Sequence, residues 1–206
     1  MGLGASASWA YPSWPYSYGD YVNTSSDVDS QSTSDAIRWW PAPGYSTSSN
    51  YYAIADSLAG MFHWRIDQAA SDWSGVDTLF HFYELDWNQV ESQYDHTFGQ
   101  KPLIPIAETT RFFKRDASGR PTFDYWYIRF NSNLTFGDAS PTNNVYDMKG
   151  VALHEMGHTI RLKDVDYAVP ANDSSKWPTM HAYYGSGETW IRTLSAYDIT
   201  AVGGLY

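Results

Sequence analysis

The stretch His154-Glu155-Met156-Gly157-His158-Thr159-Ile160-Arg161-Leu162-Lys163-Asp164 contains three potential metal ligands and one carboxylate that can act as a base. Residues four apart lie on the same face of a helix, so His154 and His158 can present two imidazoles to one ion. Glu155 lies beside them and is placed to handle a proton. The pattern therefore predicts a helix with the ligands of a zinc hydrolase. The competing interpretation is a pair of histidines that only cap or pack a helix.

The identity of the third ligand needs a separate argument. A catalytic zinc ion generally takes three protein ligands and leaves a fourth position for water. Asp164 lies six residues after the second histidine, so the chain can leave the helix, reverse and return a carboxylate to the ion. We favour Asp164 for this reason. Asp166, His181 and Glu188 are the alternatives.

Length and composition restrict the classes of protein. The 206 residues suit one domain, and we predict a surface arm over residues 1–35 before a catalytic domain over residues 36–206. The chain has no cysteine, so a bound zinc ion would have to use His, Asp or Glu. A net charge of −10 opposes nonspecific binding to nucleic acid or anionic membranes. No apolar run approaches the ~18 residues of a membrane span.

Aromatic residues are abundant, with 10 Trp and 17 Tyr against 13 Lys plus Arg. With loops rich in Ser, Thr, Asn and Gly, this composition is commoner in secreted proteins than in cytosolic ones. The opening segment Met1 to Ala7 lacks the basic and apolar parts of a signal peptide. We therefore expect a secreted monomer whose signal peptide has been removed.

The N-terminal arm mixes Trp and Tyr with Ser, Asp and Gly and has no helical or strand periodicity. Within it, Asp27 to Asp35 has alternating oxygen ligands, as a calcium loop does. Ser32 stands where an EF-hand has glycine, and Arg38 stands where it has the final glutamate. A polar loop is the favoured interpretation, and irregular binding of structural calcium is the alternative.

The hydrophobic pattern predicts the order of the other elements. We expect two long helices, over 51–73 and about 146–160, and a short final helix over about 195–202. The expected strands cover residues 36–40, 78–85, 102–107 and 123–130. A loop rich in Gly, Asp, Asn and Pro leads to the helix that carries the histidines.

The motif and the residues downstream of it resemble those of the metzincin metalloproteases, whose pattern is HExxHxxGxxH or HExxHxxGxxD followed by a methionine turn. The aspartate ending is similar to that of the snapalysins. Trp177-Pro178-Thr179-Met180-His181 resembles the methionine turn, and Leu194 to Tyr206 resembles the C-terminal helix of matrixins. The resemblance implies an α+β fold with a twisted mixed sheet, a long packing helix and an active-site helix. It also implies a smaller C-terminal subdomain, with Met180 as an apolar floor under the zinc.

The chain departs from the family pattern at two places. Arg161 stands where the family has a glycine that lets the chain turn after the second histidine. Astacins and serralysins have a tyrosine two residues after the methionine, where this chain has Ala182. Tyr183 and Tyr184 follow, and either could line the cleft or stabilise the transition state. Ordinary packing is the alternative for both.

These observations predict a zinc endopeptidase that hydrolyses peptide bonds through a zinc-bound water activated by Glu155. The partner would be a protein or peptide substrate, extended along an exposed sheet edge near Tyr125 to Phe130. Two alternatives stay open from the sequence. One is a zinc-stabilised module for adhesion or carbohydrate binding, and the other is a protease-like fold that Arg161 has made inactive.

Overall fold

The structure is a computed structural model that describes residues 48–54, 58, 60–76, 80–84, 96–103, 105–115, 121–160, 162, 164 and 177–203. The predicted N-terminal arm with its calcium-like loop, the strand expected over 36–40, Arg161 and Asp166 lie outside these residues. None of the described helices combines the length and apolar character that crossing a bilayer requires.

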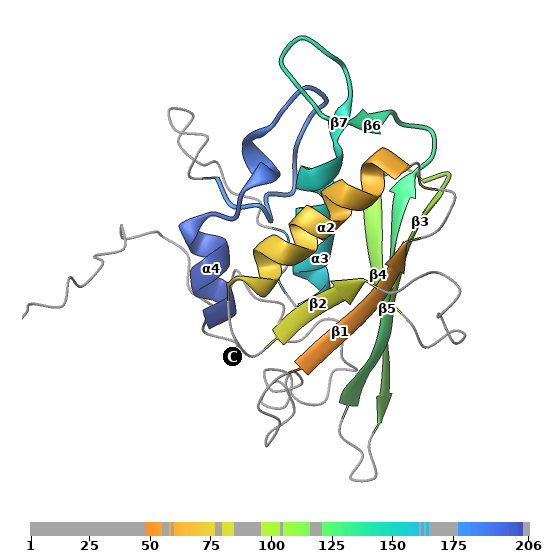
Figure 1. The fold of residues 1–206 in the computed structure, drawn as a ribbon, viewed down its shortest axis with the longest axis vertical. Coiled ribbons are helices and arrows are strands. Elements are labelled where there is room, and N and C mark those ends of the chain that lie inside the picture. The colour runs from red at the N-terminus through yellow and green to blue at the C-terminus, as the bar shows by residue number, and fades with distance from the viewer. Residues whose placement is uncertain are drawn as a thin grey trace, which may run out of the picture.

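A five-stranded mixed sheet forms one layer of the molecule (Figure 1). Its strand order is β2-β1-β3-β5-β4. The strands are β1 (Ser48–Ile54), β2 (Phe80–Glu84), β3 (His96–Lys101), β4 (Ala107–Arg115) and β5 (Pro121–Asn131). All neighbours run parallel except β4, which is antiparallel to β5. Two short strands, β6 (Phe136–Gly137) and β7 (Tyr146–Asp147), pair separately.

The position of β4 corrects the predicted substrate edge. Residues 125–130 belong to β5, which pairs with β3 on one side and β4 on the other. From Tyr127 to Phe130 that strand is paired on both sides, so this part of it has no free edge. Among the described strands, β4 ends the sheet and pairs on one side only. The expectation failed because the sequence indicates which segments are strands and does not give their order.

Helix α2 (Gly60–Ser74) is shorter than the predicted helix over 51–73, because residues 51–54 belong to strand β1. Ile54 is buried in that strand, and Leu58 is buried in a bend before the helix. Their spacing of four therefore relates a strand residue to a residue in a bend, and neither belongs to the helix. The buried face of α2 is formed by Ile66, Ala69, Ala70 and Trp73.

The strand expected over 102–107 is wrong except for Ala107, which begins β4. Pro102 and Pro105 have no N–H to donate to a neighbouring strand. The buried Asn131 side chain bonds this segment instead. Its Nδ2 donates to the carbonyls of Leu103 at 3.0 Å and Pro105 at 2.9 Å, and its Oδ1 accepts from the Leu103 N–H at 3.3 Å. The chain thus leaves the sheet between β3 and β4. The strands expected over 78–85 and 123–130 are confirmed as β2 and β5.

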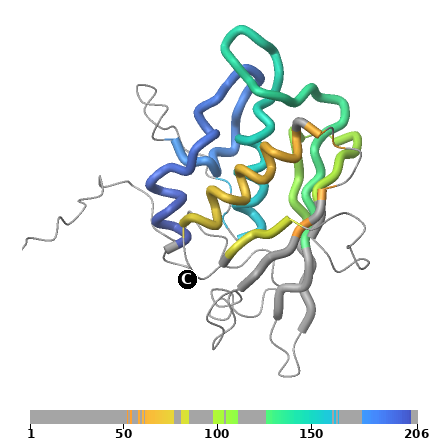
Figure 2. The backbone as a smooth tube through the Cα atoms, in the orientation of Figure 1, coloured from red at the N-terminus to blue at the C-terminus, as the bar shows by residue number. Residues whose placement is uncertain are grey.

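The helices cover one face of the sheet (Figure 1). Helix α3 (Met148–Thr159) confirms the helix predicted to carry the histidines, and α4 (Ala196–Gly203) confirms the final helix. The Trp73 indole N–H donates to the Leu153 carbonyl at 2.9 Å and joins α2 to α3. Figure 2 shows the C-terminal segment returning past α3 to end in α4. Helix α3 contacts both strand β4 and the short 3-10 helix η3 (Trp190–Arg192). The α+β class expected from the resemblance is the architecture observed.

Candidate metal centre

Helix α3 is capped at its first turn and packed in the core by its apolar side chains. Asp147 caps the first turn, with its Oδ1 accepting from the Gly150 N–H at 2.8 Å. Val151, Leu153 and Met156 are buried, as the sequence predicts for the apolar positions of this helix. His154, Glu155 and His158 of the same helix line a pocket.

The two imidazoles are held by backbone carbonyls. His154 Nδ1 lies 2.9 Å from the Thr179 carbonyl oxygen, and His158 Nδ1 lies 2.9 Å from that of Leu162. A carbonyl can only accept, so each Nδ1 carries the proton and donates it. In a neutral imidazole the Nε2 atom then keeps its lone pair for a metal. Both side chains therefore have the tautomer that a zinc site requires.

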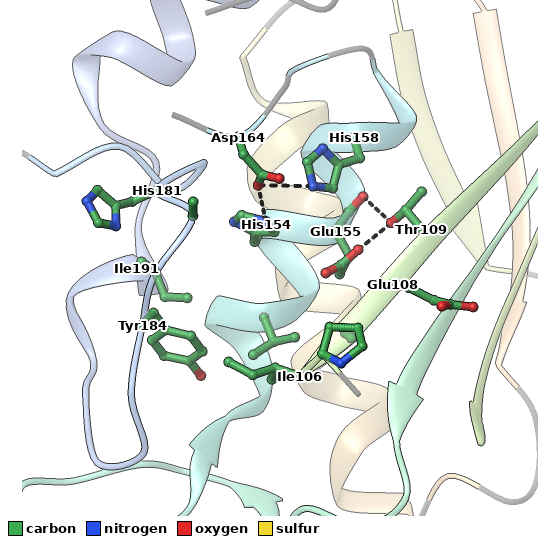
Figure 3. A pocket seen from close by; sticks show the side chains of 14 residues that line it. Ile106, Glu108, Thr109, His154, Glu155, His158, Asp164, His181, Tyr184 and Ile191 are labelled. Carbon is green, nitrogen blue, oxygen red and sulfur yellow. Dashed lines mark hydrogen bonds and ion pairs between the residues drawn. The ribbon is translucent and has the colours of Figure 1, made fainter. Parts of the chain in front are cut away.

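Asp164 completes a group of three potential ligands (Figure 3). Its Oδ1 lies 3.0 Å from His154 Nε2 and 3.5 Å from His158 Nε2. The ligand atoms of the three residues lie within 4.8 Å of one another, and no other such group occurs in the part of the chain that the structure describes. Two ligands at tetrahedral angles around zinc lie roughly 3.4 Å apart, given bond lengths near 2.1 Å. Two imidazoles and one carboxylate at this spacing fit a zinc ion with one position left for water.

Leu162 holds the chain reversal that returns Asp164 to the histidines. Its N–H donates to the Gly157 carbonyl at 2.9 Å, and its own carbonyl accepts from His158. The Leu162 side chain is fully buried. One residue therefore fixes both the turn and the orientation of the second histidine.

The other candidates for the third ligand are placed differently. The Glu188 carboxylate accepts from the Gly185 N–H at 2.7 Å and from the Trp190 indole at 3.1 Å. His181 lines the pocket, but its Nδ1 lies 2.8 Å from the Tyr183 carbonyl, and Figure 3 shows its ring directed away from Asp164. Neither residue belongs to the group of three ligands.

The electrostatics of the three ligands are coupled. Burial opposes ionisation of Asp164, but hydrogen bonds and charge interactions with the two histidines hold the pKa of its carboxyl well below the usual range. Burial would lower the pKa of His154, yet the hydrogen bond with Asp164 and the charge of Glu155 outweigh it and raise that pKa to about 9. The site therefore favours a cation close to the imidazole nitrogens.

Glu155 lies on the same helix and faces the neighbouring strand. Its side chain is buried, with 6% of the residue exposed. Thr109 of β4 places its Oγ1 2.6 Å from Glu155 Oε2 and 3.0 Å from the Glu155 backbone carbonyl oxygen. The carboxylate is thus held at the wall of the pocket that His154 and His158 also line.

Met180 lies under the histidine helix. It is fully buried, and its Sδ lies 2.2 Å from the position that a Cβ at Gly157 would occupy. The sulfur therefore packs directly on the helix backbone between the two histidines. The His181 N–H donates to the Pro178 carbonyl at 3.0 Å and closes the turn that contains Met180. The role of this turn as a methionine turn stays a prediction.

The two tyrosines after this turn have different environments. Tyr183 is 66% exposed and is not part of the pocket lining. Tyr184 lines the pocket, but its hydroxyl accepts from the Asp147 N–H at 2.7 Å and donates to the Asp147 carbonyl at 3.2 Å. Burial and the Asp147 charge raise the pKa of this hydroxyl well above its usual value. Tyr184 therefore forms the pocket wall with its hydroxyl already bonded.

The pocket has a volume of about 300 Å³ and lies between strand β4, helix α3 and the C-terminal segment (Figure 3). No local pattern indicates that Thr109, Val151 and Ile191 line the pocket, because these residues reach it through tertiary packing. The full lining is Pro105, Ile106, Ala107, Glu108, Thr109, Val151, His154, Glu155, His158, Asp164, His181, Ala182, Tyr184 and Ile191.

The chain matches no protein-family model, and no curated protein matches its sequence. Among solved structures, its fold is similar to that of high choriolytic enzyme 1, a hatching enzyme zinc-protease from Oryzias latipes (medaka fish). The TM-score is 0.47 and the sequence identity is 13%, over 84% of this chain and 96% of that one. A likeness at this level assigns no function, so the function of this chain is inferred from its own residues.

Proposed function

We propose that the chain is a zinc-dependent endopeptidase. The observation that carries this proposal is the meeting of His154, His158 and Asp164 within 4.8 Å, beside the buried carboxylate of Glu155. A zinc site that only stabilised a fold would have no chemical use for a carboxylate base beside an open pocket. A hydrolase needs both.

In this proposal His154, His158 and Asp164 would hold the zinc ion. Zinc, when bound, supplies Lewis acidity to the scissile carbonyl and to water. Glu155 accepts a proton from the attacking water at a carboxylate oxygen and then gives it to the nitrogen of the leaving amine. Glu155 thus carries one proton from the water to the leaving amine. Because water is the nucleophile, no serine or cysteine is needed.

We also propose that the substrate binds along the free edge of β4 as an extended peptide. Ala107, Glu108 and Thr109 of this strand line the pocket, so a peptide paired with their backbone would pass beside the histidines. A substrate side chain could then enter the pocket between Val151 and Ile191.

The test is to purify the chain, measure bound zinc and follow the cleavage of labelled, unfolded casein with and without a chelator. We expect one zinc per chain and cleavage that the chelator abolishes. Glu155→Gln keeps the size of the side chain and removes the base, so it should retain zinc and lose hydrolysis. Cleavage that persists in Glu155→Gln would refute the mechanism. Full zinc content without cleavage by the unmodified chain would favour a binding module or an inactive protease-like fold.

A further inference from the structure

Thr109 is the one described residue whose side chain hydrogen-bonds the Glu155 carboxylate. Its Oγ1 lies 2.6 Å from Glu155 Oε2, across 46 residues of sequence. The same oxygen lies 3.0 Å from the Glu155 backbone carbonyl. Both contacts join strand β4 to helix α3 at the residue that we propose as the base.

The hydroxyl has one proton, so it can donate a full hydrogen bond to only one of these two acceptors. A bond to an ionised carboxylate is shorter and stronger than a bond to a neutral carbonyl. The proton therefore goes to Oε2, in agreement with the shorter distance. The bond to Oε2 fixes the orientation of the carboxylate and leaves the lone pairs of Oε1 available to accept the proton of water.

The strand that carries Thr109 is hydrogen-bonded into the sheet. Thr109 is paired with Ile128 of β5, and Ile128 is fully buried. Glutamate has several rotatable bonds and would otherwise adopt several rotamers. A contact to a paired strand selects one of them, and the strand it uses is the one along which we propose that the substrate lies.

We infer that Thr109 is a positioning residue that orients Glu155 for proton transfer. This inference rests on the proposed peptidase function. The hydroxyl does not touch the substrate. It acts by holding the Glu155 carboxylate at a fixed position relative to a peptide paired with β4. Its loss should slow the chemical step without weakening the binding of substrate or zinc.

The test compares Thr109→Val with Thr109→Ser on one quenched-fluorescent peptide that contains the first casein bond cleaved. Valine keeps the branched shape of threonine and removes the hydroxyl, so kcat should fall by about 10²-fold, the scale of a small misplacement of a catalytic group. KM and the zinc content should stay at their unmodified values. Serine keeps the hydroxyl and should restore most of kcat.

The matched control is Thr200→Val in helix α4, where the hydroxyl donates to the Ala196 carbonyl at 2.7 Å on an exposed surface. It should leave kcat and KM unchanged. An unchanged kcat in Thr109→Val would overturn the inference, as would an equal loss in Thr109→Ser or an effect confined to KM. These outcomes are distinct from failure of the proposed function, which would be seen as absent cleavage in the unmodified chain or persistent cleavage in Glu155→Gln.

Discussion

Gly157 lies between the two histidines and faces the sulfur of Met180. A Cβ at this position would also approach the Trp73 ring, at 3.2 Å. The absence of a side chain lets Met180 and its turn approach the helix backbone closely. The close packing of the turn on helix α3 thus requires glycine at position 157.

Gly157→Ala tests this contact. Alanine in place of glycine inside a helix normally gains about 1 kcal/mol, whereas overpacking a core costs about 1–3 kcal/mol. With a contact of 2.2 Å to Met180 Sδ, we expect the second effect to win, for a net loss of about 1–2 kcal/mol in denaturant unfolding.

Gly60→Ala is the control, because nothing lies within 4 Å of its Cβ position at the start of α2. It should be neutral or slightly stabilising. If the contact with Met180 is the cause, the cost of Gly157→Ala should largely vanish in a Met180→Ala background. An equal cost in both backgrounds would contradict this explanation.

Asp164→Ala tests the third ligand. Even residues that only support metal ligands change affinity by 10–100-fold, so the loss of a ligand should raise the zinc Kd by at least about 10²-fold. Competition with a chromophoric chelator measures this Kd. Glu188→Ala removes an equal charge from outside the ligand group and should change it little. Unchanged affinity in Asp164→Ala would redirect the search to Asp166 or His181.

At the scale of elements, α4 holds the turn that contains Met180 through one carboxylate. Asp198 is fully buried, and its Oδ2 accepts from the Thr179 N–H at 3.0 Å, the Ser195 N–H at 2.7 Å and the Ser195 hydroxyl at 2.8 Å. The Thr179 carbonyl in turn accepts from His154. The last helix is thereby linked to the first ligand.

Asp198→Ala should leave these buried donors without an acceptor. At about 1–3 kcal/mol for each unsatisfied group, we expect a loss of roughly 3 kcal/mol in the free energy of unfolding and weaker zinc binding. Asp138→Ala breaks the exposed pair with Arg65 and should cost less than about 1 kcal/mol. Equal losses in the two variants would show that burial of Asp198 is unimportant.

The sequence predicts an element well when the spacing of its own residues defines it. It fails where the conformation depends on contacts with residues far away in the chain. The spacing of His154 and His158, with buried Val151 and Met156, specified α3 without knowledge of any other segment. The segment over 102–107 has the apolar composition of a strand, but Asn131 satisfies its backbone from elsewhere in the chain. Such an interaction has no periodicity that a sequence can display.

At the scale of the whole molecule, zinc binding should stabilise the fold, because its three ligands are brought together only when the chain is folded. With free zinc at about 100 times its Kd, the gain is about 2.7 kcal/mol. For a chain of this size that corresponds to roughly 5–10 °C in Tm. Thermal unfolding with zinc and with a chelator measures the difference, and equal Tm values would contradict a zinc site in the folded chain.

The effect of zinc should depend on pH in a defined direction. The pKa of His154 is raised to about 9. Its contribution to the free energy of unfolding of the metal-free chain is therefore fully present below about pH 6.5 and is lost as pH rises through about 9. The lowered pKa of Asp164 makes its contribution present above about pH 4 and lost at lower pH. Zinc must displace the His154 proton, so the zinc-dependent rise in Tm should grow between pH 6.5 and 9. A rise that shrinks over this range would contradict the assignment.

The candidate site could be predicted from the sequence only where its residues are close together in the chain. His154, Glu155, His158 and Asp164 lie within eleven residues, and Met180 follows at a distance that the family resemblance makes recognisable. Thr109 reaches Glu155 across 46 residues, and Arg192 reaches Asp147 across 45. Contacts of this kind follow from the packing of the sheet against α3, which the spacing of residues does not encode.

The Asn131 side chain also bears on how the pocket could diversify. It binds the carbonyls of Leu103 and Pro105 and the N–H of Leu103, and its own N–H donates to the Ile106 carbonyl. These partners are all backbone groups, which most amino acids supply equally. The side chain at position 106 can therefore be substituted without a change in the path of the backbone at the pocket wall. In the proposed peptidase, substitutions at Ile106 would then change the preferred substrate, while Asn131 keeps the backbone of this segment in place.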